Sequence, residues 1–269
     1  MKLSRIAAYA WALVLAVALS LTGAGVAAAA TQAAGSHYVA LGDSYSSGLA
    51  AGSYDSSSGS CKRSTKAYPA LWAAAHSPAS FDFTACSGAR TGDVTSSQLG
   101  PLSSTTDLVS ITIGGNDAGF ADVMTNCVLY SESTCLSKVA SARAYVDSTL
   151  PGLLDSVYSA IRSKAPNAHV VVIGYPHFYK IGGNCVAGLS ENSRSAINGA
   201  ADELNSVTAK RAADHGFSFA DVAPAFTGHE ICSSSPWLNS VVWTNISESY
   251  HPTAAGQSGG YLPTFTNAA

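Results

Sequence analysis

The chain has 269 residues, of which 47% are hydrophobic and 12% charged, and its formal net charge is −3. This composition is that of a globular protein with enough apolar residues for a full core. Because the sequence holds no cluster of basic residues, it excludes nucleic-acid binding as the function.

The first 33 residues have the pattern of a cleaved secretory signal peptide. Lys2 and Arg5 form a short basic start, residues 6–21 are an apolar stretch, and Ala28-Ala29-Ala30 offers a cleavage site, with residues 33–34 as alternatives. The other interpretation is a membrane anchor, but the apolar stretch is short for a membrane span. We therefore expect a secreted, extracellular protein with no stable membrane span.

Residues 34–269 are expected to form one domain of about 235 residues, whose charge without Lys2 and Arg5 changes from −3 to about −5. Strand-like runs rich in β-branched and aromatic residues alternate with stretches whose apolar residues follow helical spacing. In chain order we predict strand 37–42, helix 68–75, strand 81–86, strand 108–114, one long helical stripe 139–161, strand 169–175, helix 197–212, strand 217–222 and a short helix 253–261. Several strands are apolar without alternation, as in sheets that are covered on both faces. The pattern predicts an α/β three-layer sandwich around a central parallel five-stranded sheet.

The exported part holds six cysteines, and an even number in an oxidising compartment indicates three disulfides. Six cysteines allow fifteen pairings. The short separation makes Cys127–Cys135 the safest pair, and chain order suggests Cys61–Cys86 and Cys185–Cys232. Long irregular loops at 50–60 and 227–240 contain or adjoin a cysteine, which suggests functional loops held by disulfides. No C-x-x-C pair is present, so a zinc site is not expected.

Polar residues follow several predicted strands at the edge where ligands bind in open α/β sheets. "LGDSYSSG" places Ser44 after the first strand, and "CSGA" and "IGGND" follow the second and third strands. "ESYHPT" lies before the last predicted helix. Gly-Asp-Ser alone is a common turn sequence. Its position beside the other segments is what makes Ser44 a candidate nucleophile.

These segments supply the groups that acyl transfer by a serine requires, namely a base and donors for the oxyanion. His251 is the candidate base. The candidate donors are the backbone N–H groups of Ser44 and Gly88 and the side-chain N–H of Asn116.

The ordered segments "GDS", "CSG", "GGND" and "HP" resemble those of the SGNH (GDSL) hydrolases over nearly the whole exported chain. The signal peptide, the six cysteines and "GDSYSSG" are most similar to the secreted actinobacterial lipases, phospholipases A and esterases of that family. The resemblance implies a flavodoxin-like sheet and ester hydrolysis through an acyl-enzyme. It implies Ser44 as nucleophile, His251 as base, and Ser44, Gly88 and Asn116 as the oxyanion hole.

One position departs from the family pattern. The family's usual partner of the histidine is an aspartate three residues earlier, and Glu248 stands there in this chain. Some relatives use a loop carbonyl instead. Because Glu248 lies in the polar run "NISES", we expect it to point to solvent, and we expect a main-chain carbonyl near Ser249 to orient His251.

Other polar candidates have simpler interpretations. Asp43 and Asp117 are expected to hold turns in place rather than to take part in chemistry. The remaining histidines show no metal-ligand spacing, so neither a metal nor another cofactor is expected. These histidines are His37, His76, His169, His177, His215 and His229.

The segment before His251 is apolar and has two interpretations. Its residues Trp237, Leu238, Val241, Val242 and Trp243 are either ordinary core or an acyl-chain wall and interfacial patch, with Phe120 opposite. The leading hypothesis is a monomeric serine esterase that acts on lipid esters and contacts lipid interfaces transiently. The alternatives are a polysaccharide acetyl-esterase of the same fold and a non-catalytic binding module.

Overall fold

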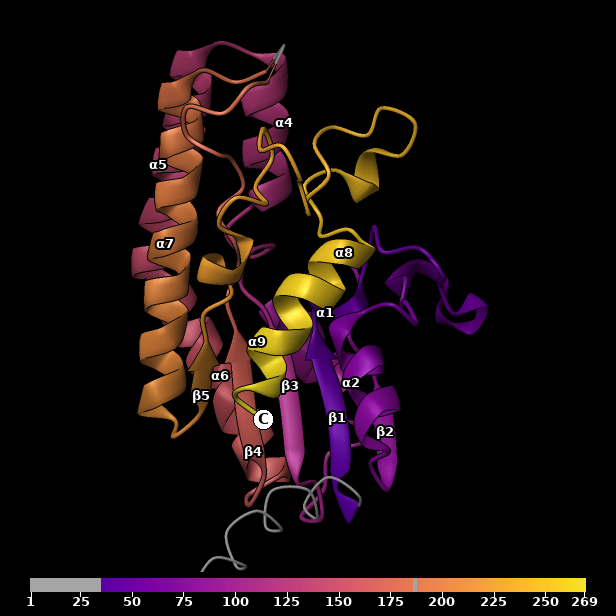
Figure 1. The fold of residues 1–269 in the computed structure, drawn as a ribbon. Coiled ribbons are helices and arrows are strands. Elements are labelled where there is room, and N and C mark those ends of the chain that lie inside the picture. The colour runs from indigo at the N-terminus through magenta and orange to yellow at the C-terminus, as the bar shows by residue number, and fades with distance from the viewer. Residues whose placement is uncertain (1–34, 186–187) are drawn as a thin grey trace, which may run out of the picture.

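The computed structural model describes residues 35–185 and 188–269, so the predicted signal peptide lies outside the described residues. In the described part, five parallel strands form one sheet in the order β2-β1-β3-β4-β5. They are β1 (His37–Gly42), β2 (Ser80–Phe83), β3 (Leu108–Thr112), β4 (His169–Ile173) and β5 (Ser218–Ala220). Helices lie on both sides of this sheet (Figure 1). The predicted α/β three-layer sandwich with a five-stranded parallel sheet is confirmed.

The strands end earlier than their apolar patterns predict. The runs 81–86, 108–114 and 169–175 leave the sheet at Phe83, Thr112 and Ile173. After β3 the chain turns at Gly114, whose φ of +114° lies in a region that favours glycine. The residues beyond the strand ends are therefore free to form the loops of the carboxyl edge.

Nine helices lie in the described residues, together with short 3₁₀ and π turns. The helices are α1 (Ser44–Ser47), α2 (Tyr68–His76), α3 (Thr91–Asp93), α4 (Phe120–Leu129), α5 (Glu132–Ser148), α6 (Leu150–Lys164), α7 (Glu191–Asp214), α8 (Ala254–Gly256) and α9 (Leu262–Thr266). The turns are η2 (Ser56–Cys61), η3 (Val94–Gln98), η4 (Ala223–Phe226), η5 (Ile246–Glu248) and η6 (Gln257–Tyr261). On one face, Tyr38 of β1 packs against Trp72 of α2 and Phe265 of α9. Helix α7 packs against α6, β4 and β5.

The long helical stripe predicted over 139–161 is wrong as a single helix. Helix α5 ends at Ser148 and α6 begins at Leu150, with Pro151 in the first turn of α6. Proline has no N–H to continue the bonds of a preceding helix but fits the first turn of a new one. The predicted helix 253–261 is also longer than expected, since α8, η6 and α9 continue to Thr266. Helix α4 was not among the predicted elements.

All three suggested disulfides are confirmed: Cys61–Cys86, Cys127–Cys135 and Cys185–Cys232. The first joins the segment after β1 to the loop after β2, and the second joins α4 to α5. The third joins the loop after β4 to the segment 227–240. The first and third disulfides therefore hold loops near the carboxyl edge of the sheet, and the second holds two helices together. None of the helices in residues 35–185 and 188–269 has the length and apolar character to cross a membrane.

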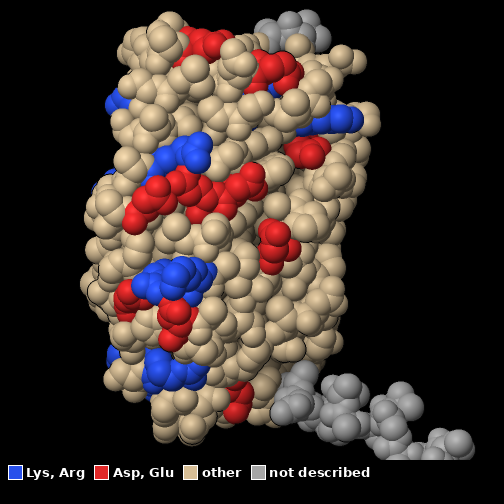
Figure 2. All heavy atoms as spheres, turned by 90° about the vertical axis from the view of Figure 1, so that its left-hand side faces the viewer, with Lys and Arg blue, Asp and Glu red and all other residues tan. Residues whose placement is uncertain are grey.

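Basic and acidic side chains alternate on the face formed by α5 and α7 (Figure 2). Arg143 of α5 pairs with Glu203 of α7, and Arg211 of α7 pairs with Asp155 of α6. This face therefore carries both signs of charge and no basic patch.

Candidate active site

Ser44 is the first residue of α1, at the sharp turn that follows β1. Gly42 has a φ of +121°, and a Cβ there would stand 2.5 Å from the Thr112 carbonyl oxygen, so the close approach to β3 requires glycine. Asp43 caps α1 by accepting a hydrogen bond from the Tyr45 N–H at 2.9 Å. The turn therefore presents Ser44 at the carboxyl edge of the sheet.

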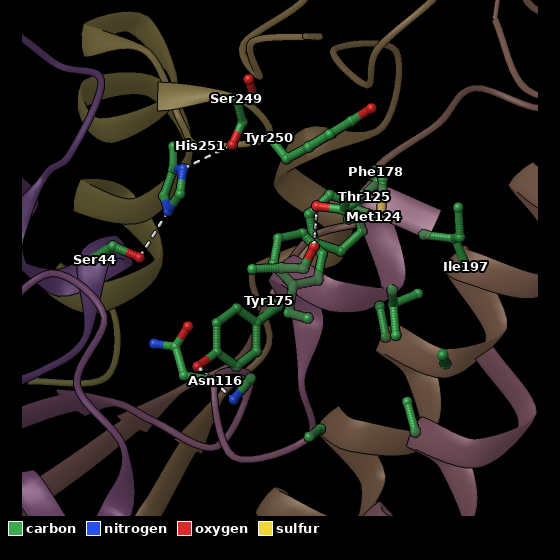
Figure 3. Close-up of a pocket in the computed structure, with 18 of the residues that line it drawn as sticks. Ser44, Asn116, Met124, Thr125, Tyr175, Phe178, Ile197, Ser249, Tyr250 and His251 are labelled. Carbon is green, nitrogen blue, oxygen red and sulfur yellow. Dashed lines mark hydrogen bonds between the residues drawn. The ribbon is translucent and has the colours of Figure 1, made fainter. Parts of the chain in front are cut away.

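Ser44, His251 and Ser249 form a hydrogen-bonded line (Figure 3). The Ser44 Oγ lies 2.7 Å from His251 Nε2, and His251 Nδ1 lies 2.8 Å from the Ser249 carbonyl oxygen. A carbonyl oxygen can only accept, so Nδ1 carries the proton and Nε2 is free to accept from the serine. Ser44 and His251 are 207 positions apart in the sequence.

Burial lowers the pKa of His251 from 6.5 to about 4, and the hydrogen bond to the Ser249 carbonyl opposes this shift. A neutral imidazole can act as a base. His251 is therefore in its basic form over the whole neutral range.

Glu248 takes a different partner from the one that its position in the family pattern suggests. Its Oε1 accepts a hydrogen bond from the Tyr54 hydroxyl at 2.8 Å, while the hydroxyl accepts from the Ala50 N–H at 2.9 Å. The carboxylate is half-buried rather than directed to solvent as expected. Glu248 thus joins two loops, and the Ser249 carbonyl is what contacts the histidine.

The candidate oxyanion donors come together beside Ser44. Gly88 and Asn116 line the same cavity as Ser44. The Asn116 Nδ2 donates one hydrogen bond to the Ala89 carbonyl at 2.9 Å, which leaves its second N–H available. Gly88 has a φ of +82° and no atom within 4 Å of the place where a Cβ would stand, so its surface toward the cavity is open.

Asp117 holds the two donor loops together. Its carboxylate accepts hydrogen bonds from Thr91, at 2.6 Å from the hydroxyl and at 3.1 Å from the N–H. Thr91 follows the Gly88 loop and Asp117 follows Asn116, so this contact joins the loop of Gly88 to the loop of Asn116. Asp117 thus has a structural place in the site, as the sequence suggested.

Asp43 is almost fully buried beneath the nucleophile turn. Its carboxylate accepts from the Thr112 hydroxyl at 2.7 Å, from the Tyr45 N–H and, through a short hydrogen bond, from the Tyr175 hydroxyl. Burial raises the pKa of Asp43 to about 6, although these three hydrogen bonds lower it. Asp43 therefore ties the turn to the ends of β3 and β4.

An apolar cavity of about 630 Å³ opens beside these residues. Ser44 and His251 lie on one side of it, and Met124, Phe178 and Ile197 lie on the other (Figure 3). Further apolar lining residues come from α4, α5 and α7: Val123, Val128, Val139, Val146 and Leu204. A cavity of this size and character fits a hydrocarbon chain.

The apolar segment before His251 divides between the two expected roles. Val241 and Trp243 line the cavity, as does Phe120. Trp237 instead stacks on His229 with ring centroids 3.6 Å apart, and Leu238 is buried in the core. Sequence reasoning missed Tyr175, the lining from α7 and, apart from Phe120, the lining from α4. The helical spacing in α7 was visible, but it did not show that part of its apolar face borders a cavity.

No group of three or more His, Cys, Asp or Glu residues within the described ranges could hold a metal ion. His177 and His215 pair with Asp202 and Asp155 instead. His229 contacts Trp237. The structure thus accounts for these histidines without a common site.

Comparison with known proteins places these features in one family. Residues 40–258 match the GDSL-like lipase/acylhydrolase family. The chain is 71% identical to "Lipase 1" of Streptomyces coelicolor and 66% identical to "Lipase" of Streptomyces rimosus, with 100% of each chain covered in both cases. It is also similar to the crystal structure of phospholipase A1 from Streptomyces albidoflavus, with 70% identity and a TM-score of 0.86 over 88% of this chain and 100% of the other. The chain belongs to the GDSL-like lipase/acylhydrolase family.

Proposed function

We propose that this protein hydrolyses the carboxylic esters of lipids, as a phospholipase A or lipase, with Ser44 as nucleophile and His251 as base. Ester hydrolysis follows from the family to which the chain belongs. The observation that carries the rest is the 2.7 Å contact between Ser44 Oγ and His251 Nε2 at the edge of an apolar cavity.

The first half of the reaction forms an acyl-enzyme. His251 Nε2 takes the proton of Ser44 as Oγ bonds to the ester carbonyl carbon, whose oxygen becomes an oxyanion. The N–H groups of Ser44, Gly88 and Asn116 donate to that oxyanion. His251 then gives its proton to the leaving alcohol oxygen as the carbon–oxygen bond breaks.

Water completes the cycle. His251 takes a proton from the water as its oxygen attacks the acyl carbon, and returns it to Ser44 Oγ when the fatty acid leaves. The Ser249 carbonyl holds Nδ1 throughout and fixes the tautomer. It lacks the full charge of a carboxylate and so stabilises the imidazolium less.

The cavity favours a lipid over the alternatives. A polysaccharide acetyl-esterase requires only a small acyl site beside an open polar cleft, whereas apolar residues of α4, α5 and α7 line this cavity. A non-catalytic binding module would have no need of the Ser44–His251 contact. The relatives named above are lipases and a phospholipase A1, which supports the same choice.

We also propose that the enzyme acts as a secreted monomer that touches lipid surfaces transiently. Among the described residues the most exposed large hydrophobic side chains include Leu129, Trp243 and Ile246, which also line the cavity, and Tyr130 beside them in sequence. Exposed apolar side chains beside a pocket are typical of a lipid contact. The signal peptide predicted over residues 1–33 and the disulfides support secretion.

The decisive experiment compares the protein with Ser44→Ala on phosphatidylcholine vesicles, triacylglycerols, a soluble p-nitrophenyl ester and acetylated xylan. The variant should lose turnover on every ester by about 10⁶-fold, the loss known for the nucleophile of the serine hydrolase studied in most detail. A serine-directed phosphonate should label Ser44 alone. Undiminished hydrolysis by the variant would refute the assignment, and preference for acetylated xylan would favour the polysaccharide esterase.

A second comparison tests the lipid contact. Tyr130 is 63% exposed and does not line the cavity, so Tyr130→Ser should slow hydrolysis of vesicles and leave hydrolysis of the soluble ester unchanged. Equal rates on vesicles for the variant and the parent protein would contradict the contact.

A further inference from the structure

The turn that carries the histidine has an unusual backbone conformation. Tyr250, between Ser249 and His251, has a φ of +63°. For a bulky residue this left-handed conformation is strained, and surrounding contacts must hold it in place. The sharp turn brings the Ser249 carbonyl to the imidazole of His251, only two residues later.

One contact to this turn comes from the nucleophile segment. The Tyr45 hydroxyl donates a hydrogen bond to the Tyr250 carbonyl at 2.7 Å, across 205 residues of sequence. Tyr45 is buried directly after Ser44, and its ring centroid lies 5.2 Å from that of His251. The backbone of Asn239 pairs on the other side, with bonds of 3.0 Å to the Tyr250 N–H and the His251 carbonyl.

We propose that Tyr45 is a positioning residue for the histidine. Its hydroxyl holds the Tyr250 carbonyl, and thereby the left-handed turn that presents the Ser249 carbonyl to His251. The hydrogen bond links the nucleophile helix to the turn that carries the base. This inference rests on the proposed pairing of Ser44 with His251.

Tyr45→Phe tests the hydroxyl because phenylalanine keeps the ring and its packing. The matched control is Tyr38→Phe, which removes another buried hydroxyl, bonded to Ser110 at 2.7 Å in the core. We expect Tyr45→Phe to lower kcat on a soluble p-nitrophenyl ester by about threefold to tenfold, the range for one hydrogen bond. The KM should change by less than about twofold, since the ester contacts remain. Tyr38→Phe should leave kcat unchanged while lowering the thermal stability by about as much as Tyr45→Phe does.

A spectroscopic measurement separates positioning from loss of stability. The proton on His251 Nδ1 should give a downfield proton resonance, assigned by its absence in His251→Ala. The resonance should persist in Tyr38→Phe and broaden or disappear in Tyr45→Phe. An unchanged resonance and unchanged kcat in Tyr45→Phe would overturn the inference. If Ser44→Ala is inactive in the same assays, the proposed function still stands.

Substitutions at Tyr250 test the turn independently of whether Tyr45→Phe folds. Both Tyr250→Asn and Tyr250→Val remove the ring, but asparagine adopts the left-handed conformation readily and β-branched valine resists it. We expect kcat of the valine variant to be several-fold lower than that of the asparagine variant. Tyr45→Phe should lower kcat by a smaller factor when it is introduced into the Tyr250→Asn variant than when it is introduced into the parent protein. Equal kcat for both variants, or an undiminished effect of Tyr45→Phe, would contradict the proposal.

Discussion

Removal of the Glu248 carboxylate distinguishes a carbonyl-oriented histidine from a carboxylate triad. In the structure this carboxylate accepts from Tyr54 at 2.8 Å, and His251 Nδ1 is bonded to the Ser249 carbonyl. Glu248→Ala should therefore leave kcat/KM on a soluble p-nitrophenyl ester within about tenfold of the parent, whereas loss of a triad carboxylate lowers the rate by about 10⁴. The losses in kcat/KM expected for the two arrangements thus differ by about a thousandfold.

The same substitution should have a measurable effect on stability. A hydrogen bond to a charged group contributes about 1.5 kcal/mol at the lower end of its range, which suits a half-buried carboxylate. For a domain of this size the melting temperature should fall by about 3–6 °C. Tyr54→Phe removes the other partner and also the acceptor of the Ala50 N–H, so it should lower the melting temperature at least as much, with little effect on kcat.

Combining the two substitutions completes the test. Because they remove one shared bond, the double variant should lose less stability than the sum of the single variants. A loss of a thousandfold or more in kcat/KM for Glu248→Ala, with the melting temperature preserved, would refute the reasoning and restore the carboxylate triad.

Three further predictions concern the oxyanion donor, the base and the disulfides. Asn116→Ala should lower kcat by about 10² to 10³ with a smaller change in KM, and a loss confined to KM would show that Asn116 only binds substrate. Because the pKa of His251 is lowered to about 4, the base is neutral above that value, so the main acid limb of the kcat/KM–pH profile should lie near pH 4. A shallower inflection near pH 6 would report Asp43, and a main limb at pH 6.5 would contradict the burial of the base. Replacing Cys61 and Cys86 together by serine should destabilise the fold by about 2–4 kcal/mol in thermal or urea denaturation, and unchanged stability would show that the loop needs no bond.

The sequence by itself determined the class of fold and suggested the candidate nucleophile, base and oxyanion donors. Apolar runs and helical spacing depend on local backbone geometry and burial, so they located the five strands and most of the long helices. The parallel arrangement brings the carboxyl ends of strands to one edge, so the strand pattern predicted that the segments with Ser44, Gly88 and Asn116 lie together. The roles expected of these residues came from the chemistry of acyl transfer and from the family resemblance. The short separation suggested the disulfide Cys127–Cys135, and chain order suggested the other two.

Only the tertiary structure decided which groups those residues contact. Tyr54 and Glu248 are 194 positions apart, and Tyr45 and Tyr250 are 205 apart, so no local pattern could pair them. The cavity likewise arises because α4, α5 and α7 pack with a gap between their apolar faces. The spacing of apolar residues along a helix is the same whether its apolar face packs against a neighbour or borders a cavity, so the sequence does not show the gap. Local patterns show which side chains turn inward, whereas the packing of distant elements determines what those side chains meet.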